Sequence, residues 1–254
     1  HMEILKPGAD VGIRNLGFGR GMCFRRGKKY LFSCYARSTG AECTIRVTLR
    51  DGEDACLAEG RLIAKGQWEK HTAILEIADE SGCSMAGGTE ILGELERSGI
   101  SGRTEGAGET GQAVETGSLA ITVLAGSGVE LDLVSLFPEE TYLGRENGLR
   151  SDLAEALAEL KPKFMRFPGG CLVHDGSLDE NARDSLYRWK NTLGALEDRP
   201  ARRSNWKYNQ TLGLGYYEYF RFCEDIGTKP VPILPAAYDP HHKRMAPLDE
   251  LEPW

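Results

Sequence analysis

Several features are scarce or missing in this sequence, and each absence excludes a class of protein. No apolar run reaches the roughly 20 residues that a membrane-spanning helix needs, so no membrane partner is expected. The net charge of -7 at pH 7 argues against a nucleic-acid partner, because such proteins present a basic face. The 7 cysteines are odd in number and include no CxxC pair, so neither a disulfide framework nor a zinc site is expected.

The sequence says little about the cellular compartment of the protein. Cysteines without paired spacing give only a weak preference for a reducing, cytoplasmic location. The chain begins with His1 and Met2, which have the form of a remnant left after tag removal. The absence of a signal peptide therefore says nothing about the natural protein, and its localisation stays unknown.

The first part of the chain, residues 3–138, is predicted to be all-β. Residues 44–50 alternate polar and apolar side chains, which is the period of a strand with one buried face. Similar runs predict further strands, and short strands at this spacing are typical of a jelly-roll-like β-sandwich, similar to carbohydrate-binding modules. The further strands are expected at residues 30–37, 71–77, 119–124 and 129–137. Residues 79–117 interrupt the pattern and are rich in glycine and acidic residues, so we expect a long loop or a disordered segment there, with at most a brief helical turn at residues 91–95.

The second part, residues 139–254, alternates helical and strand patterns. Leucines recur at helical spacing over residues 149–160, and an apolar strand follows at residues 164–167. A second helix is expected from about residue 216 to 226, a second strand at residues 231–235, and a third helix from Pro247. This order is typical of a (β/α)8 TIM barrel, of which only the first part is present. The fold class is therefore a two-domain α+β protein, a β-sandwich followed by an incomplete barrel.

Five blocks of the sequence together resemble family 51 of the glycoside hydrolases, the α-L-arabinofuranosidases. The blocks are LDLVSLFP at 131–138, GRENGLR at 144–150, LKPKFMRFPGGC at 160–171, YRWKNTLG at 187–194 and GLGYYEYFRFCED at 213–225. Several motifs in the right order are far harder to obtain by chance than one. The resemblance is strong over residues 130–254 and looser over residues 11–75.

The resemblance implies a retaining glycosidase, in which one glutamate acts as acid/base and another as nucleophile. In the family the acid/base lies in an Asn-Glu pair, and this sequence has none. Both catalytic glutamates are therefore expected beyond Trp254. The implied substrate is an arabinose-containing polysaccharide or oligosaccharide such as arabinan or arabinoxylan. The barrel would be completed by the remainder of the enzyme or by a second copy in a homo-oligomer. The alternative is that the sandwich binds carbohydrate by itself or merely supports the barrel.

Three residues of the strand and turn at 164–171 are candidate site residues. Arg166 lies in an apolar strand and needs a carboxylate partner, because an unpaired buried guanidinium is costly. By resemblance this arginine hydrogen-bonds the nucleophile and keeps it ionised, whereas the alternative is a structural ion pair elsewhere. Gly170 lets a ligand approach the backbone closely. By resemblance Cys171 borders the arabinose subsite, although a lone cysteine is more often a small core residue.

Four residues after this strand are candidate substrate-binding residues. The aromatic side chains of Tyr187 and Trp189 suit stacking on a sugar ring, and packing of the long loop is their alternative role. Lys190 and Asn191 either hydrogen-bond sugar hydroxyls or face solvent.

No metal or cofactor is predicted. Asp239, His241 and His242 are metal-ligating residue types, but they lie in a proline-rich connection without a fourth ligand. The resemblance also implies no metal.

Overall fold

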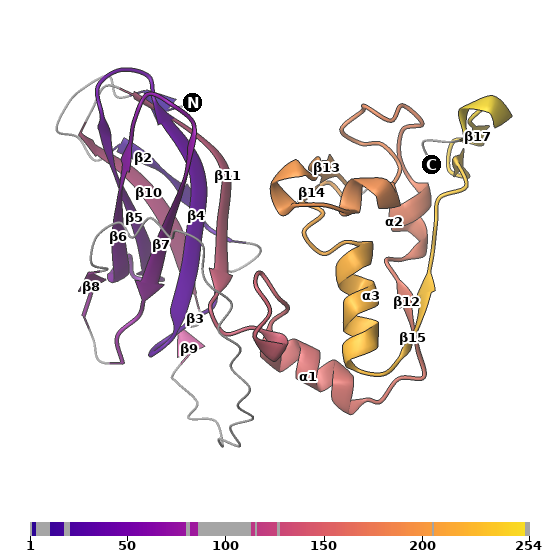
Figure 1. Cartoon of the computed structure of the whole chain (residues 1–254), viewed down its shortest axis with the longest axis horizontal. Helices are drawn as coiled ribbons and strands as arrows, with labels where there is room; N and C mark the ends of the chain where they lie inside the picture. The colour runs from indigo at the N-terminus through magenta and orange to yellow at the C-terminus, as the bar shows by residue number, and fades with distance from the viewer. Residues whose placement is uncertain are drawn as a thin grey trace. The chain divides into compact units, whose positions relative to one another are not determined.

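The computed structural model describes residues 2–3, 11–17, 21–79, 82–85, 113–114, 116–125, 128–204 and 206–251. The chain divides into two compact units, His1–Asp152 and Leu153–Trp254 (Figure 1). Each unit is described by itself.

The first unit contains two β-sheets. One has the strand order β1-β11-β4-β7, with β1 at Met2–Glu3, β11 at Gly128–Pro138, β4 at Lys29–Ser38 and β7 at Glu69–Glu76. The other has the order β2-β10-β5-β6-β8, with β2 at Val11–Asn15, β10 at Gly117–Ala125, β5 at Cys43–Asp51, β6 at Cys56–Ala64 and β8 at Ser84–Met85. A separate pair joins β3 (Phe24–Arg25) to β9 (Ala113–Val114).

One hydrophobic core lies between the two sheets. In β4 every second side chain is buried, so Phe32 and its neighbours on that face point inward. From the other sheet, Ile45, Leu49 and Leu119 join the same buried cluster. Burying a side chain the size of Phe32 contributes about 2 to 3 kcal/mol. The alternation in the sequence thus produces a β-sandwich, as predicted.

A disulfide bond links Cys56 to Cys83, which the sequence analysis did not expect. Cys56 begins β6 and Cys83 directly precedes β8, and these two strands pair in parallel. Strand pairing therefore brings together two cysteines that are 27 residues apart in sequence, a spacing with no recognisable pattern. Most of the predicted loop at residues 79–117, including residues 91–95, lies outside the described residues.

The second unit is built around a parallel pair of strands, β12 (Phe164–Phe167) and β15 (Lys229–Pro232). Its helices are α1 (Ser151–Glu159), which begins at the boundary of the units, α2 (Gly170–His174) and α3 (Tyr216–Asp225). Two short antiparallel pairs join β13 (Arg202–Arg203) to β14 (Asn209–Gln210) and β16 (Tyr238–Asp239) to β17 (Arg244–Met245). Single 3-10 turns occupy Tyr142–Gly144 in the first unit and Trp189–Thr192, Leu196–Asp198 and Leu248–Glu250 in the second.

Helix α3 has clear sequence signals at both ends. The Glu218 carboxylate accepts the N–H of Gly215 at 2.8 Å, which satisfies a donor at the helix start. At the other end Gly227 has φ +68°, and the Thr228 N–H donates to the Cys223 carbonyl at 2.8 Å. A glycine in this conformation ends helices because it has no side chain to clash. Helix α3 therefore forms where it was predicted.

One expectation for the second unit needs correction. In place of a third helix from Pro247, the described residues show one 3-10 turn, Leu248–Glu250. The predicted helix forms as α1, and its Leu153 and Leu157 side chains are exposed. The described residues of this unit contain one parallel pair of strands, which by itself does not show a barrel.

Candidate active-site edge

The two parallel strands of the second unit place their carboxyl ends on one edge. Phe164 lies opposite Lys229 and Phe167 opposite Pro232, so both strands end at the same level. The Ile233 N–H continues the pairing by donating to the Phe167 carbonyl at 2.7 Å. In parallel α/β folds such edges carry the functional residues, because the loops that follow the strands meet there.

The chain leaves β12 through Pro168 and two glycines before entering α2. The Phe167–Pro168 peptide bond is cis, and Gly169 has φ +145°, a backbone conformation that only glycine adopts without strain. Helix α2 then begins at Gly170 and presents Cys171 as an exposed free thiol. The Pro-Gly-Gly motif thus forms the turn between β12 and α2.

Arg166 directs its guanidinium group to this turn. A Cβ atom added at Gly170 would lie 3.6 Å from Arg166 Nη2 and 3.9 Å from His174 Nε2, so these groups surround the glycine. Arg166 is exposed, which differs from the buried guanidinium assumed from the apolar strand, and among the described residues no carboxylate pairs with it. The structure therefore places the Arg166 guanidinium beside Gly170, which Cys171 directly follows on α2.

Tyr187 lies in the core of this unit, which differs from the predicted contact with a sugar. Its side chain is 2% exposed and belongs to a cluster with Phe167, Tyr216 and Leu212. Phe167 also stacks on Tyr219 with ring centroids 4.7 Å apart. Burial raises the pKa of the Tyr187 phenol. The alternative role, packing of the long loop, therefore describes Tyr187.

Trp189, Lys190 and Asn191 form most of a 3-10 turn beside this cluster. Trp189 is half-buried against it, and Lys190 Nζ lies 6.0 Å from the centroid of the indole ring. Lys190 is exposed and Asn191 is half-buried. Thr192 fixes the turn, because its hydroxyl donates to the Trp189 carbonyl and accepts the Tyr216 N–H at 3.0 Å.

Arg199 organises the long connection before α3, and sequence reasoning did not single it out. Its guanidinium makes a bidentate pair with Glu218 at 2.8 and 2.9 Å. It also donates to the carbonyls of Gly194 and Leu212, each at 2.9 Å. The Arg199 side chain is only 3% exposed. No sequence signal could have found it, because its partners lie on both sides at unrelated spacings.

Replacing Arg199 by methionine should lower the free energy of unfolding by about 3 kcal/mol. The substitution leaves the Glu218 carboxylate without its charge partner and the backbone carbonyls without their hydrogen-bond donor. Urea titration followed by circular dichroism measures this loss. The control is Arg183→Met, because Arg183 is exposed and, among the described residues, its side chain hydrogen-bonds Asn209 alone, at 3.4 Å. The control should change stability by less than about 0.5 kcal/mol. Equal effects of the two variants would show that the Arg199 network is not stabilising.

A second buried arginine, Arg202, supports the same connection. Its Nη2 donates to the Ser185 carbonyl at 2.7 Å, and its Nη1 donates to Gln210 at 2.9 Å. Its guanidinium lies 5.8 Å from the Tyr187 ring centroid. Burial lowers the pKa of Arg202, which stays positively charged at neutral pH. Two buried arginines thus hold the loop that carries the aromatic candidates.

An open pocket of about 550 Å³ lies within this unit, between the residues that follow α2 and those of β13 and β17. Its lining is polar and carries both signs of charge: Asp175, Gly176, Ser177, Asp184, Arg203, Ser204, His242 and Arg244. The buried Ser204 hydroxyl has no hydrogen-bond partner within the described part of the chain. Such a lining suits a polar ligand better than an apolar one.

The turn between β16 and β17 is held by the fully buried Asp239. Its Oδ1 accepts the N–H groups of His241 and His242 at 3.0 and 3.2 Å. Its Oδ2 contacts His242 Nδ1 at 2.5 Å and Arg244 Nη2 at 3.3 Å. Burial alone would raise the pKa of Asp239, but the hydrogen bonds from His242 and Arg244 stabilise the carboxylate more strongly. The pKa of Asp239 therefore lies below its ordinary value.

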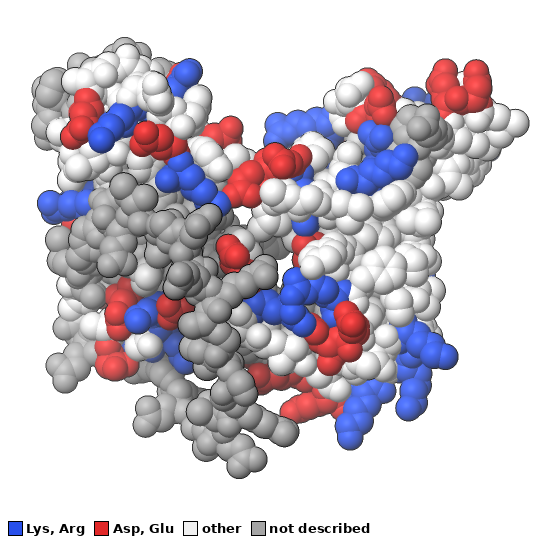
Figure 2. All heavy atoms as spheres, viewed as in Figure 1, with Lys and Arg blue, Asp and Glu red and all other residues white. Residues whose placement is uncertain are grey.

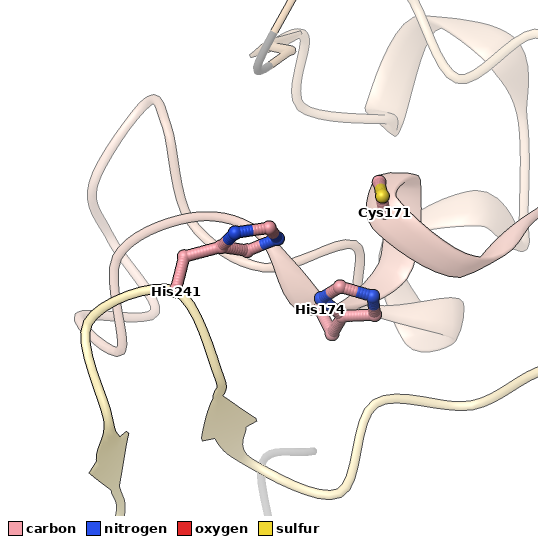
Figure 3. A group of neighbouring side chains, drawn as sticks. All are labelled: Cys171, His174 and His241. Atoms are coloured by element: carbon pink, nitrogen blue, oxygen red, sulfur yellow. The ribbon is translucent and has the colours of Figure 1, made fainter.

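With His242 held by Asp239, the neighbouring His241 points toward α2 (Figure 3). The rings of His241 and His174 stack with centroids 5.1 Å apart and planes 23° from parallel. Cys171 lies on the same helix three residues before His174. Sequence analysis noted His241 and His242 but could not see that α2 faces them.

Comparison with known proteins supplies the family. A family model described as the alpha-L-arabinofuranosidase 1 domain matches residues 156–254. The extracellular exo-alpha-L-arabinofuranosidase of Streptomyces chartreusis is 37% identical over 91% of this chain and 24% of its own length. Alpha-L-arabinofuranosidase 1 of Arabidopsis thaliana is 34% identical over 89% of this chain and 28% of its own length. The solved structure of the arabinose-bound MgGH51 α-L-arabinofuranosidase matches 97% of this chain and 35% of that one, with a TM-score of 0.72 and 27% identity.

The chain is similar to the α-L-arabinofuranosidases of glycoside hydrolase family 51 over most of its length. It spans about a quarter of the length of the Streptomyces and Arabidopsis relatives, 24% and 28%. The match to MgGH51 extends over both units, so the sandwich as well as the αβ unit has a counterpart in a family 51 structure.

The distribution of surface charge and the length of the helices are relevant to the partners of this chain. On the face that Figure 2 presents, acidic and basic side chains are interspersed among the coloured residues. An uncharged sugar polymer does not require a patch of one sign. The helices of the described residues are all too short or too polar to cross a membrane.

Proposed function

We propose that this chain forms part of an α-L-arabinofuranosidase, a retaining glycosidase that releases terminal arabinofuranose from arabinan or arabinoxylan. The observation that carries the proposal is the position of Arg166. Its guanidinium lies beside Gly170 at the carboxyl end of β12, without an acidic partner among the residues described. A cation placed at a strand edge in this way is suited to hold a carboxylate that arrives from another strand.

The residues of the edge have distinct roles in this proposal. Arg166 hydrogen-bonds the nucleophilic carboxylate and keeps its pKa low, so that it attacks as the anion. Gly170 and the exposed Cys171 border the arabinose ring, with Trp189, Lys190 and Asn191 on the aglycone side. Both catalytic carboxylates come from outside these 254 residues, in two displacements through a covalent glycosyl-enzyme.

The barrel itself is part of the proposal. Phe164 on β12 is 63% exposed, and Leu234 after β15 is 54% exposed. Leu160, directly after α1, is 74% exposed. Apolar side chains at these levels favour burial against further elements. The remainder of the enzyme would provide them, and a second copy of the chain is the alternative.

The proposed compartment differs from the weak cytoplasmic preference of the sequence analysis. The Cys56–Cys83 disulfide favours an oxidising environment. The name of the Streptomyces relative also describes an extracellular enzyme. We therefore place the protein outside the reducing cytoplasm.

The test is hydrolysis of an aryl α-L-arabinofuranoside by the complete protein. Turnover is expected, and Cys171→Trp should lower kcat/KM about 100-fold, because the indole displaces the sugar from its reactive position. Cys23→Trp is the matched control, since Cys23 is an exposed free cysteine of the other unit. Absence of turnover on arabinofuranosides, with turnover on another glycoside, would refute the proposal. Absence of turnover on every glycoside tested would favour the alternative, a sandwich that binds carbohydrate or supports the barrel.

A further inference from the structure

The cluster of Cys171, His174 and His241 is a set of metal-ligating side chains that the proposed reaction does not use as a group. One ligand atom from each residue lies within 4.8 Å of the other two. In a tetrahedral zinc site the donor atoms lie about 3.5 Å apart, given metal bonds of about 2.0 to 2.3 Å. Side-chain rotation of the exposed Cys171 and His241 by about 1 Å would close the difference.

Two elements present these ligands toward one point. Cys171 and His174 are three residues apart on α2, so they lie on the same side of the helix. His241 comes from the turn between β16 and β17, where Asp239 accepts its backbone N–H at 3.0 Å. Figure 3 shows the His241 ring directed toward the helix. Buried hydrogen bonds of this kind fix the orientation of a ligand-bearing turn.

An unsatisfied atom points independently to a ligand. His174 Nδ1 is buried and has no hydrogen-bond partner within the described residues. A buried polar atom without a partner costs about 1 to 3 kcal/mol. Coordination of a metal ion through Nδ1 would satisfy this atom.

The neighbouring cluster of Asp175, Asp239 and His242 does not have this property, although its ligand atoms also lie within 4.8 Å of one another. Both oxygens of Asp239 already accept hydrogen bonds, and Arg244 supplies a positive charge to them at 3.3 Å. A cation there would have to displace Arg244. The two clusters share one turn, yet only the first has open ligand positions.

We propose that Cys171 Sγ and one ring nitrogen each of His174 and His241 bind a soft divalent transition metal, with Zn²⁺ as the probe. The Cys171 thiol releases its proton to solvent when the sulfur binds the metal. Three protein ligands leave a fourth position for water. Because Cys171 also borders the proposed arabinose site, a bound ion would exclude the sugar and inhibit the enzyme; this consequence rests on the proposed function, whereas metal binding does not.

The first test uses mass spectrometry to measure the rate at which the free cysteines of the isolated, metal-free chain are alkylated in oxygen-free buffer. Cys171 and Cys23 are both exposed free cysteines, so Cys23 is an internal control. At a Zn²⁺ concentration ten times the Kd, alkylation of Cys171 should slow about tenfold while Cys23 is unaffected. Equal rates at Cys171 with and without Zn²⁺ would overturn the proposal, and this readout needs no variant that must fold.

The second test uses Co²⁺ as a spectroscopic substitute for Zn²⁺. The expected spectrum has a thiolate-to-metal charge-transfer band and the intense visible bands of four-coordinate Co²⁺. Cys171→Ser should abolish the charge-transfer band, and His241→Ala should weaken binding at least about 100-fold. Cys23→Ser should change neither. Binding that survives both ligand variants would place the metal elsewhere, and inhibition of the complete enzyme is not needed for either result.

Discussion

Replacing Arg166 by leucine is expected to lower the turnover of the complete enzyme by about 100-fold or more. The guanidinium lies at the end of β12, and the proposed partner is the nucleophilic carboxylate. Without that charge the pKa of the carboxylate rises, so less of it is ionised and the acidic limb of the kcat/KM profile moves to higher pH. Initial rates on an aryl arabinofuranoside between pH 4 and 8, roughly the range in which carboxylates with raised pKa values titrate, measure both effects.

The shift of the pH profile distinguishes this role from a structural one. Arg166→Lys keeps the charge but not the forked geometry, so it should recover part of the turnover and most of the acidic limb. Arg183→Leu is the matched control, because Arg183 is an exposed arginine of the same unit. If Arg166→Leu lowered turnover with an unchanged pH profile, the residue would not be the charge partner of the nucleophile.

The isolated 254-residue chain is expected to show no turnover of the same substrate. It contains no Asn-Glu pair, and both catalytic carboxylates are proposed to come from outside it. General acid/base catalysis contributes about 100- to 10,000-fold, and loss of the nucleophile removes the covalent route entirely. The measurement is release of the aryl alcohol at high protein concentration, with the complete protein as the positive control.

If the isolated chain shows turnover, two variants decide whether the activity arises at the proposed active-site edge. Turnover by purified chain that Cys171→Trp abolishes, and Cys23→Trp does not, would show that the catalytic carboxylates lie within these residues. Turnover equally present in both variants would indicate a contaminating glycosidase.

Much of the fold could be predicted because its signals are local. The alternation at residues 44–50 marks β5 directly, since every second side chain of a half-buried strand must be apolar. Helix α3 is bounded by Glu218 and Gly227, each of which acts within one turn of the helix. Less predictable was the state of α1, whose leucines are patterned for burial but lie exposed among the described residues. The leucine pattern shows that one face of the helix is apolar, but whether that face is buried depends on the elements that pack against it.

By itself, then, the sequence determined the sandwich, the family resemblance and the strand-turn segment from Arg166 to Cys171, because these depend on neighbouring residues. The tertiary structure alone decided the rest. It buried Tyr187 among Phe167 and Tyr216, it joined Cys56 to Cys83, and it brought His241 to His174. In each case the partners are far apart in sequence, so no periodicity relates them. Contacts of this kind exist only after the strands have paired and the long connection has closed around its buried arginines.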